Sequence, residues 1–190
     1  MKVTLPEHQG EIELGTYQEY EKIVKDSITE SEKEDRVIAL FTGIDVEDVK
    51  NVTQANREYF INSINTAINT DGEFKTLFEI DGREFGLIPN ISKDEITGDE
   101  YTDLVKYGGF EWETMDRLMS VLYRPRVIKD SHNNYDIETY NGTGGHVEQI
   151  RKMPLSYAKG ALGFFLNLRN ELRLHTLQSS KEEQQKEHPL

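Results

Sequence analysis

Residues 76–88 read TLFEIDGREFGLI, and this stretch predicts a β-hairpin. Apolar and polar side chains alternate on both sides of Asp81-Gly82, which is the period expected of half-buried strands. Asp-Gly is also a preferred dipeptide of the type I′ turn, whose two central residues need positive φ. We therefore expect a hairpin at about 74–89 and a fold that contains antiparallel β-structure.

Patterns typical of helices lie on both sides of this hairpin. Apolar residues recur at helical spacing after three capping boxes of the form S/T-x-x-E, which begin at Thr16, Ser31 and Thr97. Thr53 is expected to cap a longer helix, and Pro154 to open a final helix at about 154–177. A second hairpin with a longer loop is expected in RVIKDSHNNYDIETY, residues 126–140. The predicted fold class is α+β, mainly helical.

The parts of the chain before and after the first hairpin resemble each other. EIELGTYQEY begins the first part at residue 11, and EITGDEYTDL begins the second at residue 95. Two further pairs follow in the same order: RVIALF with RLMSVL, and VKNVTQANREYFINSIN with IRKMPLSYAKGALGFFL. This order favours an internally duplicated helical unit with inserted β-hairpins, in two pseudo-repeats at about 11–68 and 95–177. The alternative is that amphipathic helices with capping boxes resemble one another by chance.

The duplication predicts a single domain over residues 1–177, because two copies of the unit can bury their apolar faces against each other. The side chains expected in this shared interior are Tyr17, Ile38, Ile64, Tyr101, Leu118 and Leu162. Residues 178–190, QSSKEEQQKEHPL, are polar and low in complexity, and we expect them to form a mobile tail.

The composition excludes several classes of protein. The 190 residues include no cysteine, which excludes disulfides, thiolate catalysis and cysteine zinc sites. The formal net charge of −13 disfavours binding to nucleic acid or anionic lipid. No apolar run is long enough to span a bilayer, and the first residues lack the apolar region of a signal peptide. We expect a protein made in cytoplasm, without membrane insertion and without sequence-specific nucleic-acid binding.

Residues suited to catalysis or metal binding are few. None of the five histidines pairs with another at i, i+4, and H-E-x-x-H does not occur. His132 and His146 could serve as ligands or bases, but solvated loop histidines are the favoured interpretation. GTGGH, residues 142–146, lacks the features of a phosphate-binding loop and is expected to be a hinge. We expect no catalytic residue, no metal and no cofactor.

Aromatic residues around Gly108-Gly109 suggest one place where a partner could bind. Tyr107, Phe110 and Trp112 lie beside these glycines, and aromatic side chains are enriched in interface cores. The alternative, favoured on general grounds, is an ordinary connection between helices that packs Trp112 into the core of the chain.

Edge strands suggest a second kind of interface. A strand in TLFEI or in YDIETY could pair its backbone with that of another chain. The aromatic residues that these strands add to the candidate interface are Phe78, Tyr135 and Tyr140.

Five short motifs together resemble small structural proteins of tailed bacteriophages, including crAss-like phages. They are I-x-L-G-x-Y from Ile12, IDG-x-x-FGLIP from Ile80, I-T-x-x-E-Y-x-D-L from Ile96, LYRP from Leu122, and MPLS-x-A-x-GAL-x-FF from Met153. The resemblance covers most of residues 11–170. It implies a virion or virion-assembly role, as a head–tail connector or tail-ring subunit, and it brings no catalytic residues with it.

The resulting hypothesis is a non-enzymatic structural protein of a tailed phage virion that mediates oligomeric assembly. Its expected partners are other copies of itself and portal, tail or ring proteins. Its expected location is the virion, and the host cytoplasm during assembly. One alternative is a tail assembly chaperone, or a packaged cargo protein, that is not part of the virion structure. Another is a metal-assisted hydrolase that uses His132, His146 and nearby acids.

Overall fold

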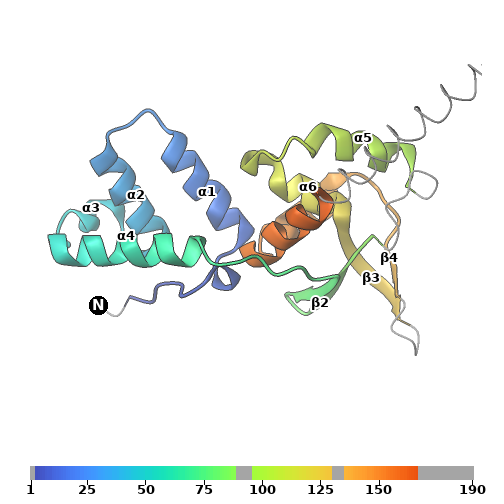
Figure 1. The fold of residues 1–190 in the computed structure, drawn as a ribbon, viewed down its shortest axis with the longest axis horizontal. Helices are drawn as coiled ribbons and strands as arrows, with labels where there is room; N and C mark the ends of the chain where they lie inside the picture. The colour runs from blue at the N-terminus through green and yellow to red at the C-terminus, as the bar shows by residue number, and fades with distance from the viewer. Residues whose placement is uncertain (1–2, 89–95, 130–134, 167–190) are drawn as a thin grey trace, which may run out of the picture.

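The computed structural model describes residues 3–88, 96–129 and 135–166. Figure 1 shows a helical N-terminal part beside a part that combines helices with a sheet. The N-terminal elements are η1 (Gln9–Glu11), α1 (Leu14–Lys25), α2 (Glu30–Thr42), α3 (Val46–Val49) and α4 (Gln54–Ile68). The later elements are β1 (Leu77–Ile80), β2 (Arg83–Leu87), α5 (Gly98–Tyr107), η2 (Trp112–Thr114), α6 (Met115–Leu122), β3 (Tyr123–Lys129), β4 (Tyr135–Ile137), η3 (Thr143–Gly145) and α7 (Val147–Ile150). A C-terminal helix, described over residues 155–166, completes an α+β fold that is mainly helical, as predicted.

The first predicted hairpin is confirmed. β1 and β2 pair in antiparallel fashion, with Ile80 opposite Arg83 across the turn. Asp81 and Gly82 have φ values of 51° and 77°, so both central residues adopt the positive φ of a type I′ turn. The alternation of apolar and polar side chains and the Asp-Gly turn therefore both specify the pairing register observed between β1 and β2.

The two hairpins join into one antiparallel sheet with the strand order β1-β2-β3-β4. The second predicted hairpin supplies β3 and β4, and β2 pairs with β3 where Phe85 lies opposite Pro125. β3 begins at Tyr123, directly after the last residue of α6. The strands that the sequence proposed as edges, β1 and β4, are the two edges of this sheet.

Caps that depend on local sequence were predicted well for α4 and α5. Thr97 and Glu100 form the expected capping box at the start of α5. The Thr53 side chain accepts a hydrogen bond from the backbone of Asn56 at the start of α4. For α2 the predicted box at Ser31 is wrong, because Thr29 and Glu32 form a capping box two residues earlier and lengthen the helix.

The predicted box at Thr16 is also wrong, because α1 begins earlier, at Leu14. The backbone N–H of Leu14 donates to the carbonyl of Met153 at 2.8 Å, and that of Gly15 donates to the carbonyl of Arg151 at 2.7 Å. These carbonyls satisfy the first donors of the helix in place of a side-chain cap. A distant segment therefore sets the start of α1, and local sequence carries no sign of it.

Two clusters of buried apolar side chains form the interior, and this overturns the prediction of one shared interior. Tyr17 and Ile64 lie in a cluster between α1, α2 and α4, whereas Leu118 lies in a second cluster under the sheet. Tyr101 is 48% exposed, although its supposed counterpart Tyr17 is 7% exposed. Across the described residues, the structure shows no internal duplication.

The C-terminal helix joins the two clusters. Leu155 is buried in the N-terminal cluster, whereas Ala158 and Ala161 lie in the cluster under the sheet. The helix begins at residue 155, next to the predicted start at Pro154, and the part of the prediction beyond residue 166 lies outside the described residues, as does the tail. One helix thus contributes to both parts of the fold.

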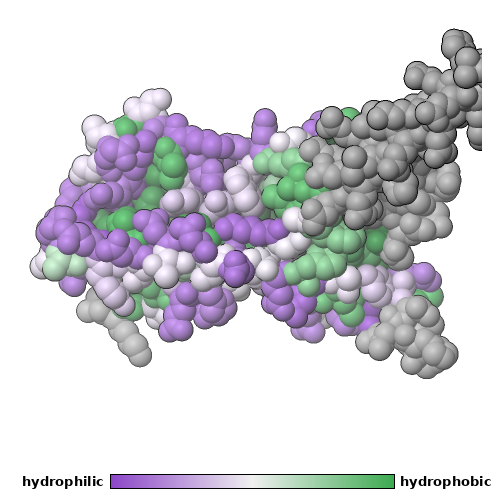
Figure 2. Space-filling model, viewed as in Figure 1, coloured by the Kyte–Doolittle hydropathy of each residue, from purple (hydrophilic) through white to green (hydrophobic). Residues whose placement is uncertain are grey.

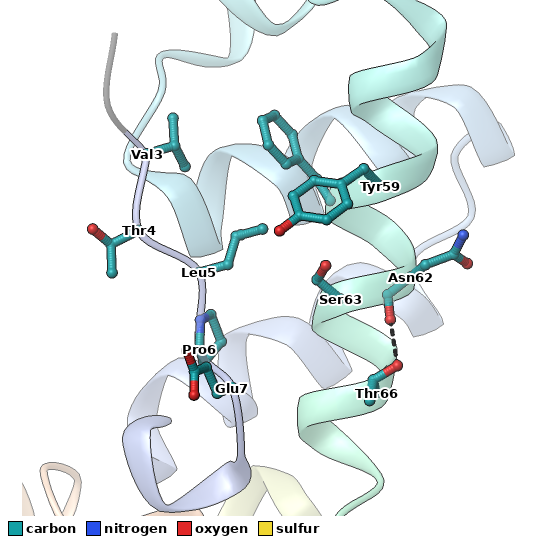
Figure 3. Close-up of a pocket in the computed structure, with 10 residues that line it drawn as sticks. Val3, Thr4, Leu5, Pro6, Glu7, Tyr59, Asn62, Ser63 and Thr66 are labelled. Atoms are coloured by element: carbon teal, nitrogen blue, oxygen red, sulfur yellow. Dashed lines mark hydrogen bonds between the residues drawn. The ribbon is translucent and has the colours of Figure 1, made fainter.

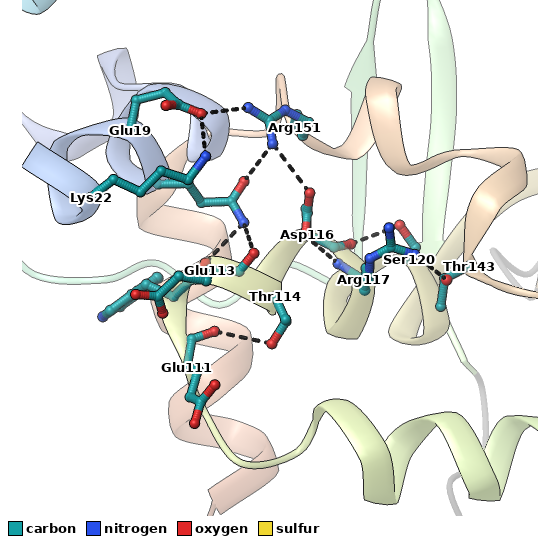
Figure 4. A network of polar contacts seen from close by, with 12 residues as sticks. Glu19, Lys22, Glu111, Glu113, Thr114, Asp116, Arg117, Ser120, Thr143 and Arg151 are labelled. Carbon is teal, nitrogen blue, oxygen red and sulfur yellow. Dashed lines mark hydrogen bonds and ion pairs between the residues drawn. The ribbon is translucent and has the colours of Figure 1, made fainter.

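Arg151 provides a polar connection between the same two parts. Its guanidinium lies 3.3 Å from the Glu19 carboxylate on α1 and 3.4 Å from the Asp116 carboxylate on α6. It also donates to the side-chain oxygen of Gln18, whose amide in turn donates to the carbonyl of Trp112 at 2.8 Å. Figure 4 shows this network, in which one side chain bridges two helices that are distant in sequence.

Candidate functional site

The candidate interface residues around Gly108-Gly109 pack against other residues of the same chain. Tyr107 is buried in the cluster under the sheet, and Phe110 packs against that cluster from a backbone conformation with φ of 64°. Trp112 is partly buried and contacts both clusters, with its ring 4.7 Å from that of Tyr17 in an edge-to-face arrangement. These contacts match the connection between helices that the sequence left open as the alternative.

Phe78, proposed as part of an edge-strand interface, belongs to an aromatic core. It is 7% exposed, and its ring centroid lies 5.0 Å from that of Tyr123 and 5.5 Å from that of Tyr157. The strand that carries it is an edge of the sheet, but the side chain itself packs inward. Any contact of a partner with β1 would therefore use the backbone rather than this ring.

Tyr135 fixes the second hairpin against the first. Its hydroxyl lies 3.0 Å from the carbonyl oxygens of both Thr76 and Leu87, so that its single proton is donated to one of them or shared between them. Its ring crosses Gly86 so closely that a Cβ built there would lie 2.4 Å from a ring carbon. Burial raises the pKa of Tyr135, which keeps its hydroxyl protonated and able to donate.

Tyr140 forms part of a half-buried polar group with Asp103 and Arg124. Its hydroxyl donates to the Asp103 carboxylate, and the Arg124 guanidinium lies 5.6 Å from its ring centroid. Burial and the nearby Asp103 carboxylate together raise the pKa of Tyr140. Tyr135 begins β4 opposite Lys129, and Tyr140 follows the end of β4, but each is engaged within the chain.

A buried ion pair that the sequence analysis did not identify anchors the same hairpin. Arg124 on β3 lies 2.7 Å from Glu100 on α5, and both side chains are buried. Glu100 also accepts from the backbone of Thr97 as part of the capping box, so it serves two partners. The sequence offered one sign of this pair, which is an arginine placed among the apolar residues of the LYRP motif.

The end of the second hairpin exposes apolar side chains. Val127 and Ile128 on β3 are 58% and 59% exposed, next to a register shift between Arg126 and Ile128. We call these two residues the distal hairpin surface. Figure 1 shows β3 and β4 extending away from the helices, so the hairpin reaches beyond the interior that holds its base.

The histidines proposed for metal chemistry take different places. His132 lies outside the described residues, whereas His146 lies 3.1 Å from the Glu138 carboxylate. Arg83 contacts the same carboxylate, and the His146 ring lies 6.2 Å from that of Phe85. Among residues 3–88, 96–129 and 135–166, no three His, Cys, Asp or Glu side chains are grouped so that they could hold a metal ion.

Charge is distributed unevenly along the chain. Residues 1–73 hold sixteen Asp and Glu against seven Lys and Arg, a net charge of −9. Figure 2 shows hydrophilic side chains over much of the N-terminal helical part on the visible face. In the described part of the chain, no helix has the length and apolar character needed to cross a membrane.

Comparison of this chain with protein-family models, with curated proteins and with solved structures gives no match.

Proposed function

We propose that this chain is a non-enzymatic structural subunit of a tailed phage virion, a head–tail connector or tail-ring component, and that it assembles through the distal hairpin surface. The observation that carries the proposal is the pair of adjacent exposed residues Val127 and Ile128 at the end of a projecting hairpin. Apolar side chains in such a position gain most when a partner covers them.

The base of the hairpin is built to hold this surface in place. The Arg124–Glu100 pair ties β3 to α5, and an ion pair between Arg126 and Glu84 ties it to β2. The contact of the Tyr135 hydroxyl with the carbonyls of Thr76 and Leu87 holds β4 against the first hairpin. A rigid base lowers the conformational entropy lost on association, which favours binding through the exposed end.

The three-residue strand β4 lies at the edge of the sheet and gives a second reason to expect assembly. An edge strand has backbone N–H and C=O groups that can pair with a strand of a neighbouring subunit. Together with Val127 and Ile128, it offers apolar contacts and backbone hydrogen bonds on one projecting element. The motif resemblance to phage structural proteins supplies the choice of a virion as the setting, and this choice rests on analogy.

Two measurements test the proposal. Mass spectrometry of purified particles is expected to detect the chain, and light scattering is expected to show that it associates with itself or with particle components. The double variant Val127→Ser/Ile128→Ser should lose this association, whereas Val24→Ser/Val46→Ser, which changes two exposed valines on α1 and α3, should keep it.

Each other result has a definite meaning. If the chain associates with particle components in lysate but is missing from particles, it is an assembly chaperone rather than a structural subunit. If it is missing from both, the virion proposal is wrong. If the Val127/Ile128 variant assembles normally, the distal hairpin surface is not the interface.

A further inference from the structure

The N-terminal arm, residues 3–7, has unused backbone hydrogen-bonding groups. Pro6 disfavours a helical conformation at Leu5 and favours an extended one. Within the described residues, no hydrogen bond joins the backbone of Val3, Thr4 or Leu5 to another residue. An extended segment with free N–H and C=O groups can pair with another strand, as an open sheet edge does.

The arm leaves a groove open between itself and α4. A groove of about 610 Å³ separates it from α4, and Figure 3 shows Leu5 pointing from the arm toward this helix. Tyr59 lines the groove and is 63% exposed, and Phe60 beside it is partly buried. A second groove of about 500 Å³ also borders the arm and is lined by Leu40 and Phe41.

The arm is nevertheless held at a fixed place. The backbone N–H of Gln9 donates to the Thr70 hydroxyl at 3.0 Å, and its side-chain amide donates to the Thr70 carbonyl. Gln9 is buried, and Leu5 packs against the N-terminal cluster. A partner strand would therefore meet a preformed edge, which lowers the entropy lost on binding.

The charge around the two grooves defines the partner. Glu7 lines the groove beside α4, Glu11 and Glu13 line the second groove, and no lysine or arginine lines either of them. The surrounding residues 1–73 carry the net charge of −9. An acidic rim favours a basic partner and repels an acidic one, and it also raises the rate of encounter.

We propose that the groove between the arm and α4 binds an extended basic segment of a partner protein, which pairs with the backbone of Val3–Leu5 and places an apolar side chain against Tyr59. This surface belongs to the N-terminal part of the molecule, whereas the distal hairpin surface belongs to the sheet. The proposal therefore stands whether or not the chain is a virion component.

The test uses a fluorescein-labelled peptide of alternating lysine and valine, KVKVKV, and the full chain. Fluorescence anisotropy is expected to show saturable binding, weakened about tenfold by Tyr59→Ser because the aromatic anchor is truncated. Val24→Ser, another exposed apolar residue outside both grooves, should leave binding unchanged. Circular dichroism confirms that both variants are folded.

Two further peptides separate strand pairing from charge attraction. KVKVKV with N-methylated backbone nitrogens keeps the charge but cannot donate, so it should bind about tenfold more weakly. EVEVEV should not bind. Equal binding of the methylated peptide, or no saturable binding of KVKVKV below about 1 mM, overturns the proposal. Self-association that Tyr59→Ser abolishes would also overturn it, because a second copy would then occupy the groove.

Discussion

Arg124 and Glu100 lie 2.7 Å apart in the interior, where they join β3 to α5. Arg124→Met is expected to lower the free energy of unfolding by about 3–5 kcal/mol, because the Glu100 carboxylate would stay buried without its partner. Equilibrium unfolding in urea measures this loss. The first part of the molecule to loosen should be the base of the second hairpin.

A double variant separates this effect from lost packing. Arg124→Met/Glu100→Gln removes both charges, and glutamine can still complete the capping box with Thr97. It should be more stable than Arg124→Met alone. If the two substitutions simply add, the pair contributes nothing as a pair and the interpretation is wrong.

Gly160 and Gly163 offer a matched test of close packing in the C-terminal helix. A Cβ at Gly160 would lie 2.4 Å from the backbone of Glu73, whereas a Cβ at Gly163 would meet no atom within 4 Å. Gly160→Ala should therefore lower the free energy of unfolding by about 1–3 kcal/mol. Gly163→Ala should raise it by about 0.5–1 kcal/mol, because alanine favours helix.

Thermal unfolding of the two variants gives the comparison. Opposite shifts in midpoint are the expected result. A loss of stability in Gly163→Ala as large as that in Gly160→Ala would mean that the approach of Glu73 to the helix is not the cause.

Arg57 and Lys50 allow a second comparison, between a largely buried ion pair and an exposed one. Arg57 contacts Asp35 at 2.6 Å with both side chains largely buried, whereas Lys50 contacts Glu47 at 2.9 Å with both exposed. Arg57→Met should cost about 3 kcal/mol because Asp35 is left buried and unpaired. Lys50→Met should cause no measurable loss, since solvent screens the exposed pair. Equal losses of unfolding free energy in the two variants, measured in urea, would contradict this expectation.

Alkaline pH is expected to destabilise the fold through its buried and half-buried tyrosines. Burial raises the pKa of Tyr17, Tyr123 and Tyr140 above the ordinary value of 10.0, so the folded state keeps protons that the unfolded state releases. The stability from these groups is present below pH 10 and is lost progressively above it, by about 1.4 kcal/mol per pH unit for each group.

Absorbance of tyrosinate during titration measures the effect. Tyr123, whose hydroxyl donates to the Lys75 carbonyl at 2.7 Å, should titrate only as the protein unfolds. Tyr123→Phe should reduce the slope of stability against pH above 10.

Features that depend on neighbouring residues were predictable from the sequence. The type I′ turn at Asp81-Gly82, the capping box at Thr97 and the Thr53 cap of α4 each need only a few adjacent residues. The chemistry of these short segments decides their conformation before any tertiary contact forms. The two hairpins were found for the same reason.

Features that depend on distant residues were not predictable. The start of α1 is set by carbonyls more than 130 residues away, which no local pattern reveals. The similarity between residues 11–20 and 95–104 suggested equivalent burial, but Tyr17 is covered by Trp112 and Tyr101 is exposed. In the candidate site, exposure at Val127 and Ile128 follows from where the hairpin projects, and residue type alone would have placed both in the core.

Leu155 is buried in the N-terminal cluster, and the carbonyls of Arg151 and Met153 accept hydrogen bonds from the first backbone N–H groups of α1. During synthesis these residues leave the ribosome long after the helices that need them. The first seventy residues therefore leave the ribosome before Leu155 can cover the apolar side chains of their cluster and before the first N–H groups of α1 find their acceptors.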